Sequence, residues 1–226
     1  MKTSPIQVTY IDKMGSDLSV VNAARVSFEK TSQFQEDGTL SPADVKLINY
    51  LARHNHWSPL AHTALQIRIK APIFVARQLV KHQIGLVWNE VSRRYVDSEP
   101  EFYFPESWRG KPVNAKQGSD GVIGDSDSVV AELVRASTEE CLQTYNALLE
   151  QGTAPEQARM VLPLNAHTEW VWSGSLVAFA RICKLRLDPH AQSETSDVAR
   201  LISPIAAKHF PVSWAALMAD TNDSTS

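Results

Sequence analysis

Several features that would place a chain in a specialised class are missing from these 226 residues. No apolar run approaches the roughly 20 residues that a membrane-spanning helix requires, and no basic stretch followed by a hydrophobic segment opens the sequence. Excess charge of one sign is also missing, because 22 basic and 25 acidic side chains leave a formal net charge of -3. We therefore expect a cytoplasmic protein that does not bind membranes or nucleic acid through its overall charge.

Cysteine is scarce, and the histidines do not form an obvious metal site in its place. Cys141 and Cys183 both lie in apolar helical patterns, which favour buried free thiols over a disulfide. His54, His56 and His62 are close in the sequence, but they lack the i, i+4 spacing of a helical zinc site and no thiolate or carboxylate set accompanies them. We expect no bound metal.

The common phosphate-binding and nucleophile motifs are missing as well. The sequence has no Walker A loop, no G-x-G-x-x-G, no G-x-S-x-G elbow and no paired-cysteine zinc spacing. Any phosphate contact must therefore be local and depend on individual side chains.

The overall composition is typical of a globular protein. Hydrophobic residues make up 43% of the chain and charged residues 21%, and the length suits one core. We expect a single domain over residues 1–220, followed by a tail at 221–226 that is small and polar enough to be disordered.

The pattern of apolar residues predicts an α+β fold, with a mixed or antiparallel sheet packed with helices. The expected strands are too few and irregular for a doubly wound parallel sheet. Strands are expected at 6–11, 65–70 and 167–172, and helices at 17–26, 42–54, 72–82, 128–150, 153–163, 176–184 and 188–208. Residues 96–125 are rich in proline and glycine, which predicts a long surface loop.

One segment, residues 78–95, gathers polar side chains that a simple core does not require. Lys81, Arg93 and Arg94 supply cationic donors, and several amide and hydroxyl side chains lie between them. A phosphorylated nucleoside engages donors of this kind. A solvated helix end whose basic residues complement the helix dipole would explain them equally well.

Two further arginines stand among apolar neighbours. Arg159 begins an apolar stretch, where it needs an anionic partner or a route to water, and a structural ion pair would satisfy it. Arg186 lies in a short connection between expected helices, in which Asp188 and Gln192 are explained as cap residues. Capping does not explain Arg186, so this residue needs an explanation of its own.

Two motifs within residues 78–95, together with other parts of the chain, resemble those of a known family. Lys81-His82-Gln83 is followed, after a spacer, by Asn89-Glu90-Val91-Ser92-Arg93-Arg94-Tyr95. They resemble the Arg-His-Arg and Asn-Glu-x-Ser-x-Arg-Tyr hallmark of the flavin-dependent thymidylate synthases. Further similarity covers, in the same order, residues 24–28, 58–62, 71–78, 159–163 and 185–192. Several motifs in one order are far more specific than any single motif.

The resemblance implies an enzyme that makes dTMP from dUMP, with methylene-tetrahydrofolate as carbon donor and NADPH-reduced FAD as hydride source. It implies a homotetramer whose active sites are shared between subunits. The residues that it places around dUMP are Gln78, Lys81, Glu90, Ser92, Arg93, Arg94, Arg159 and Arg186. The residues that it places around FAD are Ser27, Ser58, Lys81, His82, Gln83, Glu90, Ser175 and Arg181.

Arg186 is the expected catalytic residue. A cation beside the N3/O4 edge of uracil stabilises negative charge that develops there, which raises the nucleophilicity of C5 toward the one-carbon unit. Flavin-free thymidylate synthases instead use a cysteine in a Pro-Cys setting, which neither Cys141 nor Cys183 has. We therefore expect electrostatic activation without a covalent nucleophile.

The hallmark is not matched in full. Lys81 and Gln83 replace its two arginines, so that one position loses the guanidinium fork and the other loses the charge. One alternative hypothesis is therefore a catalytically inactive protein that senses nucleotide or flavin. Another is an RNA-binding module that stacks bases on Trp88 and Tyr95.

Overall fold

Four antiparallel strands form the central sheet, in the order β2–β3–β8–β4. They are β2 (Gln7–Met14), β3 (Ala64–Pro72), β8 (His167–Ser175) and β4 (Leu86–Glu90). The computed structural model describes residues 1–96, 98–113 and 118–219. The antiparallel sheet packed with helices confirms the predicted α+β class, and the three expected strands are β2, β3 and β8. β4 was not predicted.

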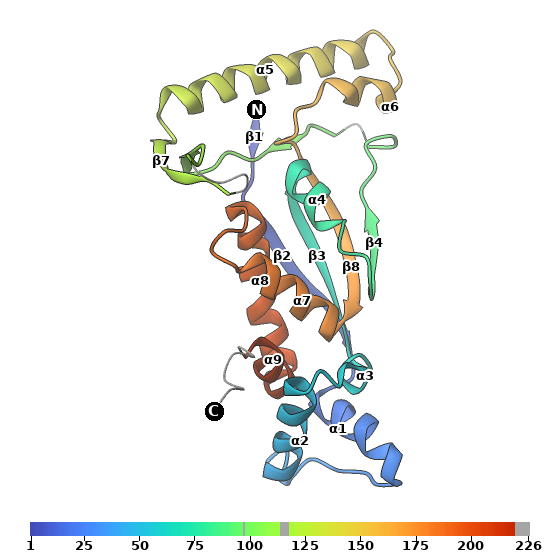
Figure 1. Ribbon diagram of the computed structural model, residues 1–226. Coiled ribbons are helices and arrows are strands. Elements are labelled where there is room, and N and C mark those ends of the chain that lie inside the picture. The colour runs from blue at the N-terminus through green and yellow to red at the C-terminus, as the bar shows by residue number, and fades with distance from the viewer. Residues whose placement is uncertain (97, 114–117, 220–226) are drawn as a thin grey trace.

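The helices of the described chain are α1 (Asp17–Arg25), η1 (Val26–Phe28), α2 (Pro42–Arg53), α3 (Trp57–Leu60), α4 (Ile73–Leu79), α5 (Val129–Glu150), α6 (Pro155–Ala158), η2 (Arg159–Val161), α7 (Leu176–Arg186), α8 (Ser193–His209) and α9 (Pro211–Met218). In Figure 1, α7 and α8 lie beside the sheet, α5 and α6 lie beyond one end of it, and α1, α2 and α3 lie beyond the other end. The short strands are β1 (Lys2–Thr3), β5 (Glu101–Phe102), β6 (Ser107–Gly110) and β7 (Asp120–Asp125).

One face of the sheet forms the main core. Leu65, Ile67 and Ile69 of β3 are at most 1% exposed, and they pack in one apolar cluster with Trp170 and Trp172 of the neighbouring β8. Residues of α4, α7 and α8 complete that cluster. The strict alternation along β3 is therefore explained by burial of one face, as the sequence predicted. Gln66, Arg68 and Lys70 carry polar side chains on the opposite face.

Local sequence signals account for several helix boundaries. Ser41 caps α2 by accepting a hydrogen bond from the backbone N–H of Asp44 at 3.2 Å, and Pro42 occupies the first helical position. Ser128 caps α5 in the same way, and Gly152 follows that helix at φ +79°. These boundaries were predicted.

Several of the expected helix boundaries are wrong. Thr153 does not form a capping box, because Ala154 is the N-cap and the following Pro155 starts a helix of only 4 residues. The last predicted helix does not begin at Asp188, since residues 188–192 form turns and α8 starts at Ser193. A separate helix, α9, follows and was not predicted.

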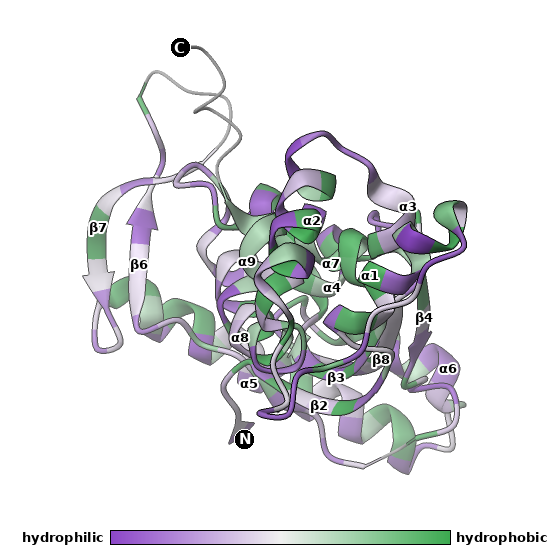
Figure 2. Cartoon of the chain, turned by 90° about the horizontal axis from the view of Figure 1, so that it is seen from below, coloured by the Kyte–Doolittle hydropathy of each residue, from purple (hydrophilic) through white to green (hydrophobic). Residues whose placement is uncertain are grey.

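The expected loop at 96–125 contains regular structure. β5 pairs in parallel with β1, and β6 pairs with β7 in an antiparallel hairpin. Figure 2 shows that hairpin standing to one side of α8 and α9. The prolines of this segment lie outside the short strands, whereas Gly110 and Gly124 take part in the pairing of β6 with β7.

Two smaller apolar clusters lie beyond the main core. One joins α1, α2 and α3 through Val20, Val21, Ile48 and Leu60. The other joins α5 to the stretch after it and includes Phe102, Leu142 and Tyr145. The expected end of the domain at residue 220 and the expected tail at 221–226 lie outside the described residues. Among the described residues we find no helix suited to crossing a membrane.

Candidate functional site

A tight turn at residues 80–85 is anchored on the start of α7. Gly85 has φ +76°, and its carbonyl accepts the backbone N–H of Ser175 at 3.1 Å. Ser175 also caps α7 through the N–H of Ala178. Farther along the helix, Nη2 of Arg181 donates to the carbonyl of Ile84 at 2.7 Å. The turn that carries Lys81, His82 and Gln83 is thus fixed at two points.

α4 ends at Leu79, which changes the expected geometry of the first motif. On the helix expected over residues 72–82, the spacing of Gln78, Lys81 and His82 would place all three on one face. Instead, Lys81 and His82 lie in the turn after the helix, and Gln78 lies in its last helical turn. Lys81 is exposed, whereas Gln78 and His82 are half-buried.

Arg186, the last residue of α7, is held by His82. Its Nε and Nη2 lie 3.2 Å and 3.0 Å from Nε2 of His82. Since the guanidinium can only donate, Nε2 is the acceptor and the imidazole is neutral with its proton on Nδ1. Burial lowers the pKa of His82, and the charges of Arg186 and Arg181 lower it further. Burial also lowers the pKa of Arg186.

A cavity of about 620 Å³, here called the Arg186 cavity, lies beside this pair. Its wall includes Gln78, Arg109, Arg186, His190 and Gln192. Two residues of the expected dUMP set, Gln78 and Arg186, are therefore brought together in one chain. The side-chain oxygen of Gln78 is buried and has no hydrogen-bond partner among the described residues.

A second cavity, of about 370 Å³, is called the Glu90 cavity because Glu90 lies in its wall with Arg93 and Arg159. Both carboxylate oxygens of Glu90 are held, one by the hydroxyl of Thr168 at 2.6 Å and the other by the indole N–H of Trp88 at 3.1 Å. This cavity shares no residue with the Arg186 cavity. The expected dUMP set is therefore divided between two places in one chain.

The arginines in and near the Glu90 cavity have partners that are close in the sequence. Arg93 donates to the carbonyl of Ser98 at 2.8 Å, and Arg94 donates to the hydroxyl of Ser92 at 3.0 Å. Arg159 is exposed and donates to the carbonyl of Glu156 at 3.2 Å. The structural ion pair considered for Arg159 is not found within the described part of the chain.

A third cavity, of about 960 Å³, is called the α7 cavity and lies between α2, the turn at 80–85 and α7. Ser175 and Arg181 of the expected FAD set line it, together with His54, Trp57 and Lys184. Among the other expected FAD residues, Ser27, Ser58, Gln83 and Glu90 are exposed. Within one chain, the expected FAD residues therefore do not line one common cavity.

Residues that sequence reasoning missed are Arg109 and Thr168. Arg109 lies on β6, inside the segment expected to be a loop, so no periodic signal placed it near the site. Thr168 reaches Glu90 through strand neighbours that only the sheet register brings together. Both cysteines are free, Cys183 buried and Cys141 half-buried, and neither lines the Arg186 cavity.

Guanidinium groups line cavities of this α+β domain, an arrangement suited to a small anionic or carbonyl-rich ligand. Residues 9–212 match the family model for Thymidylate synthase complementing protein (Thy1), and the chain belongs to that family. The resemblance drawn from the sequence motifs is thereby confirmed.

Relatives and solved structures agree with this assignment. The chain is 43% identical over 210 residues to a flavin-dependent thymidylate synthase of Thermus thermophilus, covering 92% of this chain and 74% of the relative. It is 39% identical over 215 residues to the Kosmotoga olearia protein of the same name, covering 93% and 89%. The fold is similar to that of the UMP/dUMP methylase PolB from Streptomyces cacaoi bound with 5-Br dUMP, with TM-score 0.82, 32% identity and 100% of both chains covered.

Proposed function

We propose that this chain makes dTMP from dUMP in the cytoplasm, with methylene-tetrahydrofolate as carbon donor and NADPH-reduced FAD as hydride source. The observation that carries the proposal is the Arg186 guanidinium, which His82 orients in the wall of the Arg186 cavity. The names of the relatives and the PolB structures with 5-Br dUMP and 5-Br UMP support the same type of reaction.

The α7 cavity fits FAD in size and in chemistry. Its volume of about 960 Å³ is at the upper end of small-molecule sites. Arg181 and Lys184 supply positive charge for a diphosphate, and Trp57 supplies a flat apolar ring. FAD held there would supply the redox chemistry, while the protein orients and polarises the substrate.

Arg186 is the residue to which we assign activation of the pyrimidine. A guanidinium at the N3/O4 edge stabilises negative charge on that side of the ring as C5 attacks the one-carbon unit. His82 holds two of its N–H groups, which fixes the plane of the guanidinium before substrate binds. A thiol nucleophile is not needed, and burial raises the pKa of Cys183 to about 12, which keeps it protonated.

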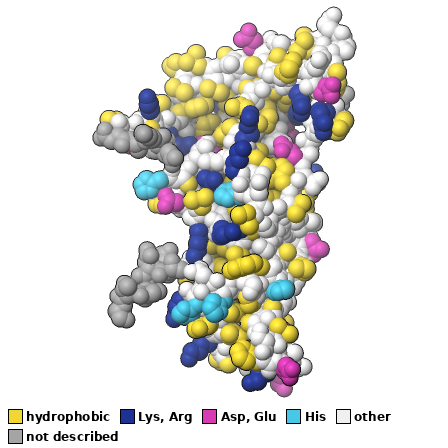
Figure 3. All heavy atoms as spheres, turned by 45° about the vertical axis from the view of Figure 1, so that its right-hand side comes forward, with side chains coloured by type: hydrophobic (Ala, Val, Ile, Leu, Met, Phe, Trp, Pro, Cys, Tyr) yellow, Lys and Arg dark blue, Asp and Glu magenta, His cyan; other side chains and the backbone are white. Residues whose placement is uncertain are grey.

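We propose that the complete site is shared between copies in a homotetramer. The Arg186 cavity contains Gln78 and Arg186, whereas Glu90, Arg93 and Arg159 line a separate cavity. In such an assembly another copy presents its Glu90 cavity to the Arg186 cavity, so that one nucleotide contacts both sets. Exposed apolar side chains on and near α5 and η2, such as Leu133 (67% exposed) and Met160 (78%), offer surface for such contacts. Figure 3 shows hydrophobic side chains gathered over that end of the molecule.

An anaerobic assay with dUMP, methylene-tetrahydrofolate, NADPH and FAD tests the proposed reaction, with dTMP measured by chromatography. We expect dTMP to depend on all four compounds, and UMP is assayed in parallel because PolB is described as a UMP/dUMP methylase. R186A should lower turnover by about 100-fold or more, since it removes electrostatic stabilisation, yet retain the yellow flavin. Wild-type protein that binds FAD and dUMP but forms no dTMP would contradict the proposal and favour the inactive sensor.

A further inference from the structure

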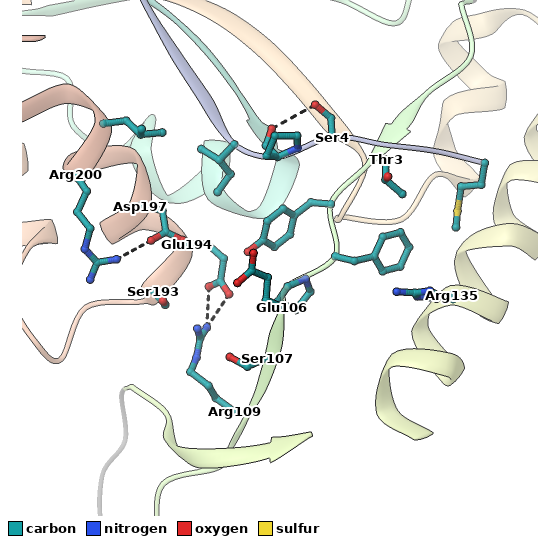
Figure 4. Close-up of a pocket in the computed structure, with 17 residues that line it drawn as sticks. Thr3, Ser4, Glu106, Ser107, Arg109, Arg135, Ser193, Glu194, Asp197 and Arg200 are labelled. Carbon is teal, nitrogen blue, oxygen red and sulfur yellow. Dashed lines mark hydrogen bonds and ion pairs between the residues drawn. The ribbon is translucent and has the colours of Figure 1, made fainter. Parts of the chain in front are cut away.

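A second arginine, Arg109, is fixed beside the Arg186 cavity by a buried carboxylate. Its Nη2 lies 2.7 Å and 2.9 Å from the two carboxylate oxygens of Glu194, which is 5% exposed in the first turn of α8. Figure 4 shows this pair in the wall of another cavity, of about 990 Å³, which Arg109 and Glu194 also line. The side-chain amide of Gln192 donates to the same carboxylate at 3.1 Å. On the other side, the pairing of β6 with β7 places Arg109 opposite Val122 and so holds its backbone.

The hydrogen bonds of Arg109 leave one end of its guanidinium available. Nη2 is occupied by Glu194, and Nε is enclosed without a partner among the described residues. Nη1 is neither enclosed in this way nor bonded to any described residue, so it can donate to a ligand. Arg186 is arranged similarly, because His82 occupies its Nε and Nη2. Arg109 and Arg186 are thus both anchored, each has an open Nη1, and both lie in the wall of the Arg186 cavity, while Arg109 also lines the cavity shown in Figure 4.

The two guanidinium groups differ in net charge. The partner of Arg186 is a neutral imidazole, so that pair keeps a positive charge. The partner of Arg109 is a carboxylate, so the charges of that pair compensate each other. A compensated guanidinium has little preference for an anion, but it still donates hydrogen bonds to neutral oxygen atoms. The carbonyl oxygens of a uracil ring are acceptors of this kind.

We propose that Arg109 is a further substrate-binding residue, which donates a hydrogen bond from Nη1 to a carbonyl oxygen of the pyrimidine in the Arg186 cavity. Glu194 and Gln192 are positioning residues that hold Arg109 in this orientation. This inference rests on the proposed function, since it takes dUMP as the ligand of the cavity.

Titration calorimetry with dUMP tests the inference on the flavin-loaded protein. R109A should raise the dissociation constant for dUMP by about 10-fold or more, as expected for loss of a hydrogen bond from a charged donor. It should raise KM for dUMP more than it lowers kcat, because Arg109 binds the ring without activating it. R109K, which retains a donor, should recover part of the affinity, and E194A should lose affinity because it releases Arg109.

R200A is the matched control. Arg200 is also paired with a carboxylate, Asp197 at 2.6 Å, but it is exposed and does not line the Arg186 cavity. R200A should bind dUMP as the wild type does, and all variants should retain FAD absorbance. If R109A, or E194A where R109A does not fold, binds dUMP with wild-type affinity, the role of Arg109 is refuted while the proposed function stands. If the wild-type protein does not bind dUMP, both are refuted.

Discussion

At the scale of single residues, the candidate site depends on pairs in which one side chain fixes another. His82 holds Arg186, Thr168 holds Glu90, and Glu194 holds Arg109. The sequence pointed to Arg186 because an arginine among apolar residues needs an explanation, and the family resemblance pointed to His82 and Glu90. The sequence did not show which side chains contact each other, since each pair joins segments that only the tertiary fold brings together.

The His82–Arg186 pair predicts an acidic limb in dUMP binding. As the pH falls below the ordinary histidine pKa of 6.5, His82 stays neutral at first because its own pKa is lowered, and then protonates. Imidazolium cannot accept from Arg186 and repels both Arg186 and Arg181, so affinity for dUMP should fall. H82Q keeps a neutral acceptor and should remove this limb when affinity is measured across the pH range.

His190 provides the control for that experiment, because it is a second histidine in the wall of the same cavity. It is exposed and hydrogen-bonded to Asp188 rather than to Arg186. H190Q should keep the acidic limb. A limb that persists in H82Q and disappears in H190Q would show that the assignment to His82 is wrong.

At the scale of elements, the sequence predicted what depends on local chemistry and missed what depends on pairing. Ser41 and Ser128 cap helices, and the alternation in β3 marks its buried face. The hairpin β6–β7 was expected to be loop because its strands gain their order from each other and from the Arg109–Glu194 contact. That error concealed Arg109.

The turn at 80–85 predicts a specific effect of changing Gly85. An alanine there must adopt φ +76°, at a cost of about 1–2 kcal/mol. Its Cβ would also lie 3.2 Å from Oγ of Ser175 and 3.3 Å from Cβ of Ala178, which pushes the turn away from α7. G85A should therefore lower both the free energy of unfolding and the affinity for FAD, measured by denaturant titration and flavin fluorescence.

Gly152 is the matched control for Gly85. It has nearly the same backbone angle, φ +79°, but no atom lies within 4 Å of an added Cβ. G152A should lose stability through backbone strain alone and should bind FAD normally. Equal FAD affinities in G85A and G152A would mean that the turn does not shape the α7 cavity.

At the scale of the whole molecule, one chain presents the expected site residues in separate cavities. The Arg186 cavity and the α7 cavity flank α7, whereas the Glu90 cavity lies along β4 and β8. No sequence pattern could show this division, because it depends on which copy faces which. Two defective chains should therefore complement each other when their defects lie in different cavities.

Mixing R186A with R159A is the most direct test of the shared site. Each variant alone should form almost no dTMP, because every one of its sites lacks one of the two arginines. After the variants are unfolded and refolded together, random assembly should give about a quarter of the sites both arginines, if each site is built from two copies. Recovery of a comparable fraction of wild-type dTMP formation supports the shared site. Mixed oligomers, verified by mass spectrometry, that remain as inactive as the separate variants would contradict it.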